Sequence, residues 1–214
     1  MIGLQLSNCI FQQNSRKTCS DSLVTALWNK NSVKWFSVDS VSNAGGILVL
    51  SNESTFKVDS IEYGGQWLGL FGLHVQLDLK YAGSSIAERR ILWEELLILQ
   101  SAFEIPLFLG GDSNETLNQN DRSSRCMNEV GSRDFSSFHS SSDLLEYPLS
   151  GHRYTRFSGH SISCVDRAFA SPECHLKFSM LTLTRRSRGL SDHCQMMLGV
   201  QNQDWGWKPF NLVL

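Results

Sequence analysis

The stretch Pro106-Leu107-Phe108-Leu109-Gly110-Gly111-Asp112-Ser113-Asn114 decides the fold of this chain. An apolar run that stops at two glycines is typical of a buried strand followed by a turn. In α/β folds, polar side chains at the end of such a strand lie where ligands bind. Asp112 and Asn114 are two residues apart, so continued strand geometry would direct both side chains to the same side. A plain turn is an equally open alternative at this point, because the last residues of the stretch are all turn formers.

Length and composition describe an ordinary globular domain. The chain has 214 residues, of which 41% are hydrophobic and 19% are charged. A formal net charge of -2 excludes an overall basic field for nucleic acid, so any such contact must come from local patches. The densest basic patch consists of Arg185, Arg186 and Arg188.

Neither a signal peptide nor an apolar run of the roughly 18 residues that a membrane span needs is visible in the sequence. The six cysteines form no C-x-x-C pair, which argues against a zinc knuckle. We therefore expect reduced thiols in an intracellular protein, nuclear or cytoplasmic, that has no membrane partner. The sequence does not indicate an oligomeric state.

The hydrophobic pattern predicts many short strands and few helices. Residues 33–75 predict a meander of antiparallel strands, whereas residues 84–103 carry apolar side chains at helical intervals with charged residues between them. Many short strands with one long and one shorter helix indicate a two-sheet α/β sandwich with the helices packed outside. The expected elements are strands at 33–41, 47–50, 56–61 and 67–75, a surface loop at 115–132, a helix at 134–141 continued by 143–145, paired strands at 150–157 and 163–171, a strand at 178–184, a basic loop at 185–189 and a last strand at 194–200.

A second polar cluster, Ser191-Asp192-His193, precedes the last expected strand. Such a pair is most often a solvated loop, and a histidine acts as a base only when a partner fixes its tautomer. Asp166 could be that partner, because a charged residue within the strand-like run 163–169 must be paired or face a site. The alternative for Asp166 is an ion pair with Arg167 or Arg153.

His74 is a third candidate, at the end of the expected strand 67–75. A histidine flanked by apolar residues is more often a satisfied core residue than a functional one. The other histidines lie in serine-rich or turn-like surroundings, and we assign no role to them.

Taken in order, these pieces resemble the endonuclease/exonuclease/phosphatase superfamily, which has the DNase I-like fold. Gly-Gly-Asp112-Ser-Asn114 matches the family pattern G-D-x-N, Val165-Asp166-Arg167-Ala-Phe-Ala-Ser171 matches I-D-x-x-x-x-S, and Ser191-Asp192-His193 follows. A narrower resemblance is to the endonuclease domain of plant LINE-type (non-LTR) retrotransposons. The narrower resemblance is carried by Trp35 with Ala44-Gly45-Gly46-Ile47-Leu48, by Arg89-Arg90-Ile91-Leu92-Trp93-Glu94-Glu95-Leu96, by Leu149-Ser150-Gly151-His152-Arg153-Tyr154-Thr155 and by Ser191-Asp192-His193-Cys194.

The resemblance implies Mg²⁺-dependent cleavage of phosphodiester bonds, with DNA as the partner. By the family pattern, Asp112 would activate or orient the attacking water and Asn114 would hold a phosphate oxygen. His193 would contact the scissile phosphate while Asp166 orients its ring, and Asp192 would help to hold the metal.

The resemblance also extends to the edges of this candidate site. His74 falls where LINE endonucleases usually carry Tyr and other DNase I-like proteins carry His, so it could donate to the phosphate. Arg185, Arg186 and Arg188 could contact the DNA backbone. We expect a family domain at 1–200 and, at 201–214, the remnant of a linker to a reverse transcriptase that is missing, because Asp204-Trp205-Gly206-Trp207-Lys208-Pro209-Phe210 resembles that segment.

The chain departs from the family pattern where the metal should bind. Leu6 stands in place of the metal-binding Glu, and the first family strand would fall before Met1, so we expect that strand to be missing. Ser113 also replaces the usual Phe of G-D-F-N. Because leucine cannot ligate Mg²⁺, the sequence predicts an endonuclease by descent whose activity is weakened or lost. The alternatives are a non-catalytic retrotransposon-derived remnant that binds nucleic acid weakly and a phosphatase of the same fold.

Overall fold

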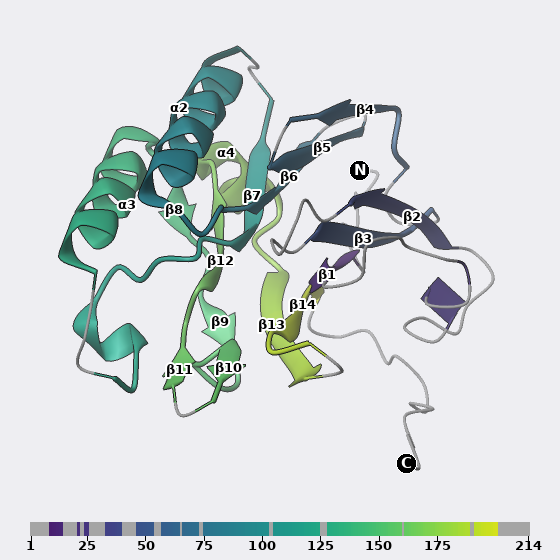
Figure 1. Ribbon diagram of the computed structural model, residues 1–214. Helices are drawn as coiled ribbons and strands as arrows, with labels where there is room; N and C mark the ends of the chain where they lie inside the picture. Colours follow the sequence, from purple (N-terminus) through teal and green to yellow (C-terminus); the bar gives the residue numbers. More distant parts are fainter. Residues whose placement is uncertain are drawn as a thin grey trace.

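The computed structural model describes residues 9–14, 21, 24–25, 33–39, 46–53, 57–64, 66–72, 75–102, 105–124, 128–159, 161–188 and 191–200. Within these residues, two six-stranded sheets and a two-stranded hairpin are formed, and the helices lie outside the sheets (Figure 1). The predictions made for Leu6, His74, the missing first strand and the linker remnant at 201–214 fall outside the described residues. None of the described helices is long and apolar enough to cross a membrane.

The first sheet brings together strands from both halves of the sequence. Its neighbouring strands are antiparallel except for the short parallel pair of β9 with β13. In spatial order the strands are β2 (Val33–Val38), β3 (Gly46–Asn52), β1 (Cys9–Asn14), β14 (Cys194–Val200), β13 (Leu181–Arg188) and β9 (Leu149–Ser150).

The second sheet contains the strand that the sequence singled out. Its only parallel pair among the described strands is β6 with β7, and the helix α2 (Ile86–Ala102) makes the crossover that such a pair requires. In spatial order the strands are β4 (Ser60–Tyr63), β5 (Trp67–Gly72), β6 (Val75–Tyr81), β7 (Leu107–Asp112), β12 (Asp166–Ala170) and β8 (Leu145–Glu146).

Smaller elements complete the described chain. The hairpin β10 (Arg156–Ser158) and β11 (Ser161–Ser163) stands below the sheets in Figure 1. The remaining helices are η1 (Gln119–Asp121), α3 (Glu129–Ser141) and α4 (Pro172–Lys177).

The alternation of side chains along β7 divides the core into two layers. Phe108 belongs to the cluster between the sheets, together with Leu68 of β5 and Leu183 of β13. Leu107 and Leu109 point the other way, into the cluster that the helices cover. The β7 strand is therefore buried on both faces, and this explains its uninterrupted apolar sequence.

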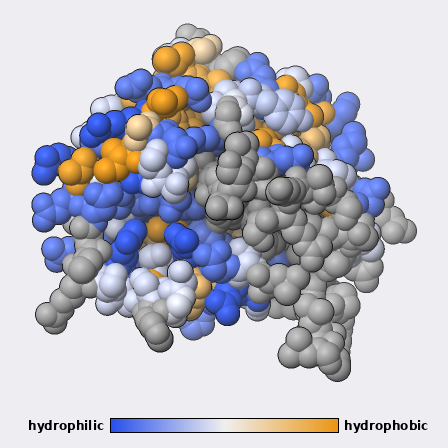
Figure 2. Space-filling view, in the orientation of Figure 1, coloured by the Kyte–Doolittle hydropathy of each residue, from blue (hydrophilic) through white to orange (hydrophobic). Residues whose placement is uncertain are grey.

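Helix α2 packs its Leu92, Trp93, Leu96 and Leu99 side chains into the outer layer. Ser85 caps this helix, because its hydroxyl accepts from the backbone of Glu88 while the Glu88 carboxylate accepts from the backbone of Ser85. Some apolar side chains remain on the surface, and Figure 2 shows apolar residues scattered among hydrophilic ones over the helices. The exposed ones on α2 and α3 are Ile91, Ile98 and Val130.

Several sequence predictions require correction. The predicted meander at 33–75 is divided, because β2 and β3 lie in the first sheet whereas β4 and β5 lie in the second. Helix α3 begins earlier than 134 and ends at Ser141, since Asp143 has a positive φ of 51°, and Leu145 starts a strand instead of continuing the helix. The strand pair predicted at 150–157 and 163–171, around Ser158-Gly159-His160, is confirmed only next to its turn, where β10 pairs with β11 and Arg156 lies opposite Ser163. The remainder of the second strand, β12, pairs with β7 instead.

Other corrections concern loops. The basic loop predicted at 185–189 is largely strand, because β13 runs to Arg188. The predicted strand at 178–184 starts only at Leu181, after helix α4, which the sequence pattern did not reveal. The segment 115–132 is not a plain surface loop, since Glu115 and Asp121 are buried within it.

Candidate active site

The candidate site is built on the pairing of β7 with β12. The last residue of β7, Asp112, lies directly opposite the first residue of β12, Asp166. His193 lies immediately before β14 and is held by a backbone bridge to Arg156 of the hairpin. Three segments that are far apart in the sequence therefore meet at one edge of the sandwich.

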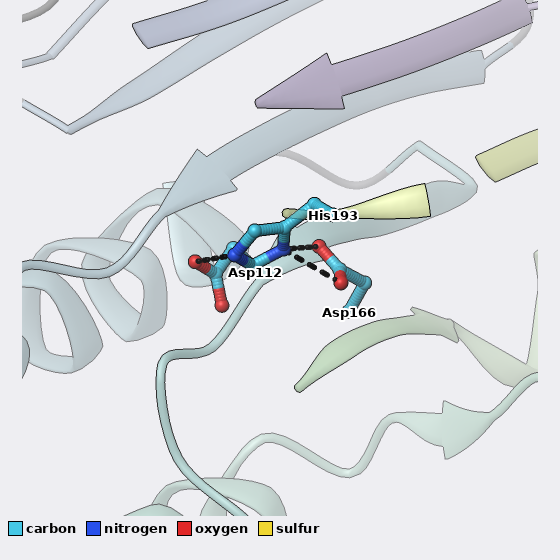
Figure 3. Close-up of side chains that lie close together, drawn as sticks. All are labelled: Asp112, Asp166 and His193. Atoms are coloured by element: carbon cyan, nitrogen blue, oxygen red, sulfur yellow. Dashed lines mark hydrogen bonds and ion pairs between the residues drawn. The ribbon is translucent and has the colours of Figure 1, made fainter. Parts of the chain in front are cut away.

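The three side chains form a short linear array (Figure 3). His193 Nδ1 lies 2.9 Å from Asp166 Oδ2 and 3.1 Å from Oδ1. The other ring nitrogen, Nε2, lies 3.8 Å from Asp112 Oδ2. All three side chains are buried, and one potential ligand atom of each lies within 4.8 Å of the others. The array can orient an imidazole, share a proton or offer oxygen atoms to a cation.

The Asp112 carboxylate is only half satisfied. Its Oδ1 accepts a hydrogen bond from the backbone of Asn114 at 2.7 Å, whereas its Oδ2 has no hydrogen-bond partner among the described residues. Burial raises the pKa of Asp112 to about 7, and the nearby charge of Asp166 adds to that rise while His193 opposes it. Asp112 is therefore able to gain or lose a proton near neutral pH.

His193 is biased toward its charged form. Burial by itself lowers the pKa of this imidazole, but the hydrogen bond to Asp166 and the charges of Asp166 and Asp112 outweigh burial and raise it. With Nδ1 donating to Asp166, the Nε2 atom is the nitrogen left to exchange a proton on the Asp112 side.

Tight turns fix the loop that follows β7. Gly111 has φ 126°, and a Cβ there would lie 2.1 Å from the carbonyl oxygen of Lys80 in the neighbouring strand, so only glycine fits. Asn114 has φ 46°, a left-handed conformation that asparagine tolerates. Its side-chain nitrogen donates to the carbonyl of Ala82 at 3.2 Å. The turn and the site, which the sequence offered as alternatives, are therefore the same segment.

Thr155 positions Asp166. Its hydroxyl oxygen lies 3.2 Å from the backbone nitrogen of Val165 and 3.1 Å from that of Asp166, and it accepts from both. Thr155 is fully buried, and its carbonyl accepts from the backbone of Cys194, next to His193. This one residue therefore ties the β12 side of the site to the β14 side.

The ion-pair alternative for Asp166 is wrong. Arg167 and Arg153 both bind Asp121 instead, and Arg167 also pairs with Glu146. Asp166 and Arg167 are successive strand residues, so their side chains lie on opposite faces of β12.

The remaining predicted residues lie around the array without joining it. Asp192 is exposed and forms an ion pair with Arg156, with Arg156 Nε 3.0 Å from Asp192 Oδ2. Burial tends to raise the pKa of Asp192, but the hydrogen bond from Arg156 outweighs burial and lowers it. Asn114 Oδ1 accepts a long bond of 3.4 Å from Arg156 Nη1.

The three predicted DNA-contacting arginines are partly committed within the protein. Arg185 and Arg188 lie over the ring of Phe157, with centroid distances of 5.4 and 5.7 Å. Arg185 also donates to the Tyr154 carbonyl, and Arg186 approaches Met197 Sδ at 3.0 Å. Arg185 and Arg188 thus pack against the hairpin beside the array, whereas Arg186 contacts β14.

Sequence reasoning missed two cationic residues of this region. Arg156 was not considered, although it directly follows the quoted motif that ends at Thr155. Lys80 was also missed: its Nζ lies 2.9 Å from Ser113 Oγ and within 4.4 Å of the Trp93 ring centroid. Burial lowers the pKa of Lys80 to about 7, although the charge of Asp112 opposes that change.

Comparisons with known proteins support the fold. A scan against protein-family models and a search of curated proteins found no match. Among solved structures, an AP endonuclease from Archaeoglobus fulgidus superposes with a TM-score of 0.67 and 11% identity, over 90% of this chain and 88% of that one. NExo from Neisseria, described as a 3′ phosphatase bound to a product DNA hairpin, gives 0.63 and 13%, over 92% and 87%.

A second NExo structure, described as a 3′-5′ exonuclease from Neisseria meningitidis, has a TM-score of 0.63 and 13% identity, over 89% of this chain and 87% of that chain. At such low identities the likeness concerns the fold. The sheets, the helices outside them and this near-complete superposition lead to one conclusion: the chain has the DNase I-like fold, an α/β sandwich.

Proposed function

We propose that the chain is a Mg²⁺-dependent endonuclease that hydrolyses phosphodiester bonds in DNA. The observation that carries this proposal is the buried Asp112–His193–Asp166 array at the ends of β7 and β12 in a DNase I-like sandwich. The ordered motifs that resemble LINE endonucleases favour DNA over other phosphoesters as the substrate.

Asp112 would orient and deprotonate the attacking water. Its Oδ2 is buried and lacks a hydrogen-bond partner among the described residues, so it can accept a hydrogen bond from a water molecule. A pKa of about 7 suits a general base that works near neutral pH. Asn114 holds Oδ1 through its backbone and thereby directs Oδ2.

His193 would donate from Nε2 to a phosphate oxygen. Asp166 accepts from Nδ1, which fixes the ring orientation and favours the charged imidazolium. A positively charged donor stabilises the negative charge that grows on the phosphoryl group in the transition state. Asp166 therefore acts through His193 as a positioning residue.

The donor set is compatible with a divalent cation. The Asp192 carboxylate lies on the exposed side of the site, beside an array whose possible ligand atoms lie within 4.8 Å of one another. Mg²⁺ is commonly held by one or two carboxylates together with substrate phosphate. A bound Mg²⁺ would neutralise charge that develops on the phosphate and on the leaving oxygen. Asp192 is the residue that would hold it, which leaves Asp112 Oδ2 to the attacking water.

We expect this activity to be weak. The resemblance expects a metal-binding Glu where the chain has Leu6, and a leucine side chain provides no ligand. This substitution also favours a second candidate function, a catalytically silent domain that binds nucleic acid.

Nicking of supercoiled plasmid tests the proposal. We expect nicks in the presence of Mg²⁺, none with EDTA, and a loss of about 100-fold or more in Asp112→Ala. Asp134→Ala is a matched control, because Asp134 pairs with Arg90 on the helical surface and takes no part in the array. Equal traces of nicking with Mg²⁺ and EDTA, unchanged by Asp112→Ala, would refute the endonuclease.

A second substrate separates the nuclease from a phosphatase. Release of phosphate from a 3′-phosphorylated oligonucleotide, without plasmid nicking, would assign the same array to a phosphatase. If neither substrate reacts but DNA is bound in a salt-dependent manner, the silent binding domain is supported instead.

A further inference from the structure

The exposed side of the site carries the Arg156–Asp192 ion pair, whereas the three residues of the array are buried. Asp112, Asp166 and His193 are at most 5% exposed. The side chains of Arg156 and Asp192, in contrast, are 34% and 44% exposed. A phosphate that approaches the array from solvent therefore meets the guanidinium of Arg156 before it reaches the buried residues.

We propose that Arg156 is a phosphate-binding side chain of this site and contacts the phosphoryl group of a nucleic acid strand. The inference rests on the proposed function, because it assumes a phosphodiester substrate at the array. It adds a residue that no motif of the sequence indicated, and it assigns to the protein itself a positive charge that does not depend on a bound cation.

The contacts of Arg156 leave part of its guanidinium available. Nε donates to Asp192 Oδ2 at 3.0 Å, and Nη1 makes only a long 3.4 Å contact to Asn114 Oδ1. Within the described part of the chain, Nη2 makes no hydrogen bond. Two parallel N–H groups of a guanidinium match two phosphate oxygens, and this geometry makes arginine a frequent phosphate ligand.

The backbone fixes Arg156 next to the reacting groups. Arg156 pairs with His193 in an isolated β-bridge, and the following residue, Phe157, donates its backbone N–H to the carbonyl of Asp192 at 2.8 Å. The guanidinium therefore starts from a fixed point beside the imidazole, as a positioned binding group requires.

The negative charges around the site also favour a compensating cation such as Arg156. Three carboxylates, those of Asp112, Asp166 and Asp192, lie in or beside the array. A phosphate would be repelled by them unless cations compensate. Among the described residues, His193 and Arg156 are the cations paired with these carboxylates, whereas Lys80 is buried and bonded to Ser113. Exchange of the exposed Asp192 carboxylate for a phosphate oxygen would keep Arg156 paired, at little cost because exposed ion pairs are weak.

The competing interpretation is that Arg156 only braces the loop through Asp192. The two interpretations predict opposite changes in single-strand binding for Asp192→Asn. If Arg156 binds phosphate, release from Asp192 should tighten the binding of a single strand, whereas loss of a brace should weaken it. The Arg156→Ala/Asp192→Asn double variant separates this coupling from the general loss of one negative charge.

The experiment measures binding of a fluorescein-labelled ten-nucleotide oligothymidylate to the full chain in EDTA. We expect Arg156→Ala to weaken binding about tenfold and to lower the salt slope by roughly 0.7, the value for one phosphate contact to a single strand. Arg156→Lys should retain part of the affinity. Asp192→Asn should tighten binding several-fold, and this gain should largely disappear in the double variant. The control is Arg153→Ala, which removes an exposed arginine bound to Asp121 and should change affinity less than twofold.

Three results would overturn the inference. They are unchanged affinity in Arg156→Ala, weakened binding in Asp192→Asn, and an Asp192→Asn gain that persists fully in the double variant. Thermal unfolding of each variant checks that a loss of binding is not a loss of fold.

The failure of this inference differs from that of the proposed function. If wild type nicks plasmid with Mg²⁺ and Arg156→Ala nicks with unchanged KM and kcat, only the role of Arg156 fails. If no protein nicks plasmid but Arg156-dependent binding persists in EDTA, the endonuclease fails and phosphate binding stands.

Discussion

Two buried aspartates, Asp112 and Asp121, have opposite electrostatic surroundings. Each is only 3% exposed to solvent. Asp121 binds Arg153 and Arg167, and although burial tends to raise its pKa, the hydrogen bond from Arg153 and the charge of Arg167 hold that pKa below its usual value. Asp112 has no arginine partner in the ion pairs of the described residues, and its pKa rises to about 7. The Asp121 carboxylate thus has arginine partners, whereas the carboxylate of Asp112, the candidate catalytic residue, has none among the described residues.

The largest expected effect comes from breaking the satisfied cluster. We expect Arg167→Met to lower the free energy of unfolding by roughly 3–5 kcal/mol, because it leaves the buried Asp121 with one fewer partner. Urea denaturation measures this loss. The control is Arg90→Met, which breaks an exposed ion pair with Asp134 and should cost less than about 1 kcal/mol. A loss of similar size in both variants would contradict the distinction between the two regions.

The next expected effect is a pH dependence of folding stability that distinguishes Asp112 from Asp121. Asp112 keeps its proton up to about pH 7 when folded, but has its usual value of 3.8 when unfolded, so ionisation destabilises wild type as pH rises through this window. We expect Asp112→Asn to equal wild type in stability near pH 4 and to exceed it by up to about 4 kcal/mol above pH 7. Urea denaturation in EDTA at several pH values measures the difference.

Asp121→Asn is the opposite case. Because the folded pKa of Asp121 is depressed, wild type should be the more stable protein at neutral pH, and its advantage should fade as acid protonates the carboxylate. If both asparagine variants change stability in the same direction, the assignment of one satisfied and one unsatisfied carboxylate is wrong.

Asp166→Asn tests the catalytic side of the comparison. We expect plasmid nicking to fall about 100-fold, because an amide no longer favours the imidazolium of His193. Glu146→Gln is the control, since Glu146 pairs with Arg167, whose side chain lies on the face of β12 opposite to that of Asp166. Nicking by Asp166→Asn within threefold of wild type would show that His193 does not depend on this partner.

The smallest expected effect is a gain. If the proposed function holds, placing a carboxylate at position 6 with Leu6→Glu should raise Mg²⁺-dependent nicking about tenfold, since one added metal ligand stabilises the charged transition state. Leu6→Gln is the matched control, because its amide is similar in size but carries no charge. Equal nicking by both variants would mean that the lost carboxylate is not what limits activity.

Much of the fold could be predicted because strand periodicity and turn residues are local signals. The strands β2, β5, β7 and β14 and the helix α2 fall within predicted ranges, and β3 extends beyond the predicted 47–50 at both ends. The division of the strands between two sheets was not predictable in this way, since pairing depends on contacts between distant segments. Helix α4 was not predicted, because its six residues are too few to show a helical period.

Residues of the candidate site could be predicted from the sequence where they belong to recognisable motifs. They could not be predicted where their placement depends on packing. The structure brings Asp112, Asp166 and His193 together, although their catalytic roles stay predictions. Lys80 alternates with apolar neighbours in β6, a pattern that predicts a solvated side chain. Helices α2 and α3 cover it instead and enclose its ammonium group with Trp93 and Phe135.

The late position of His193 and β14 in the chain has a consequence for biosynthesis. β14, which follows His193 directly, is the last described strand to leave the ribosome, and it pairs with β1, the first described strand. A nascent chain can therefore fold β7 against β12 and bring the two acids together while the imidazole is still in the exit tunnel. The array is completed only after β14 closes the sheet, so translation products that stop before β14 should lack the complete array.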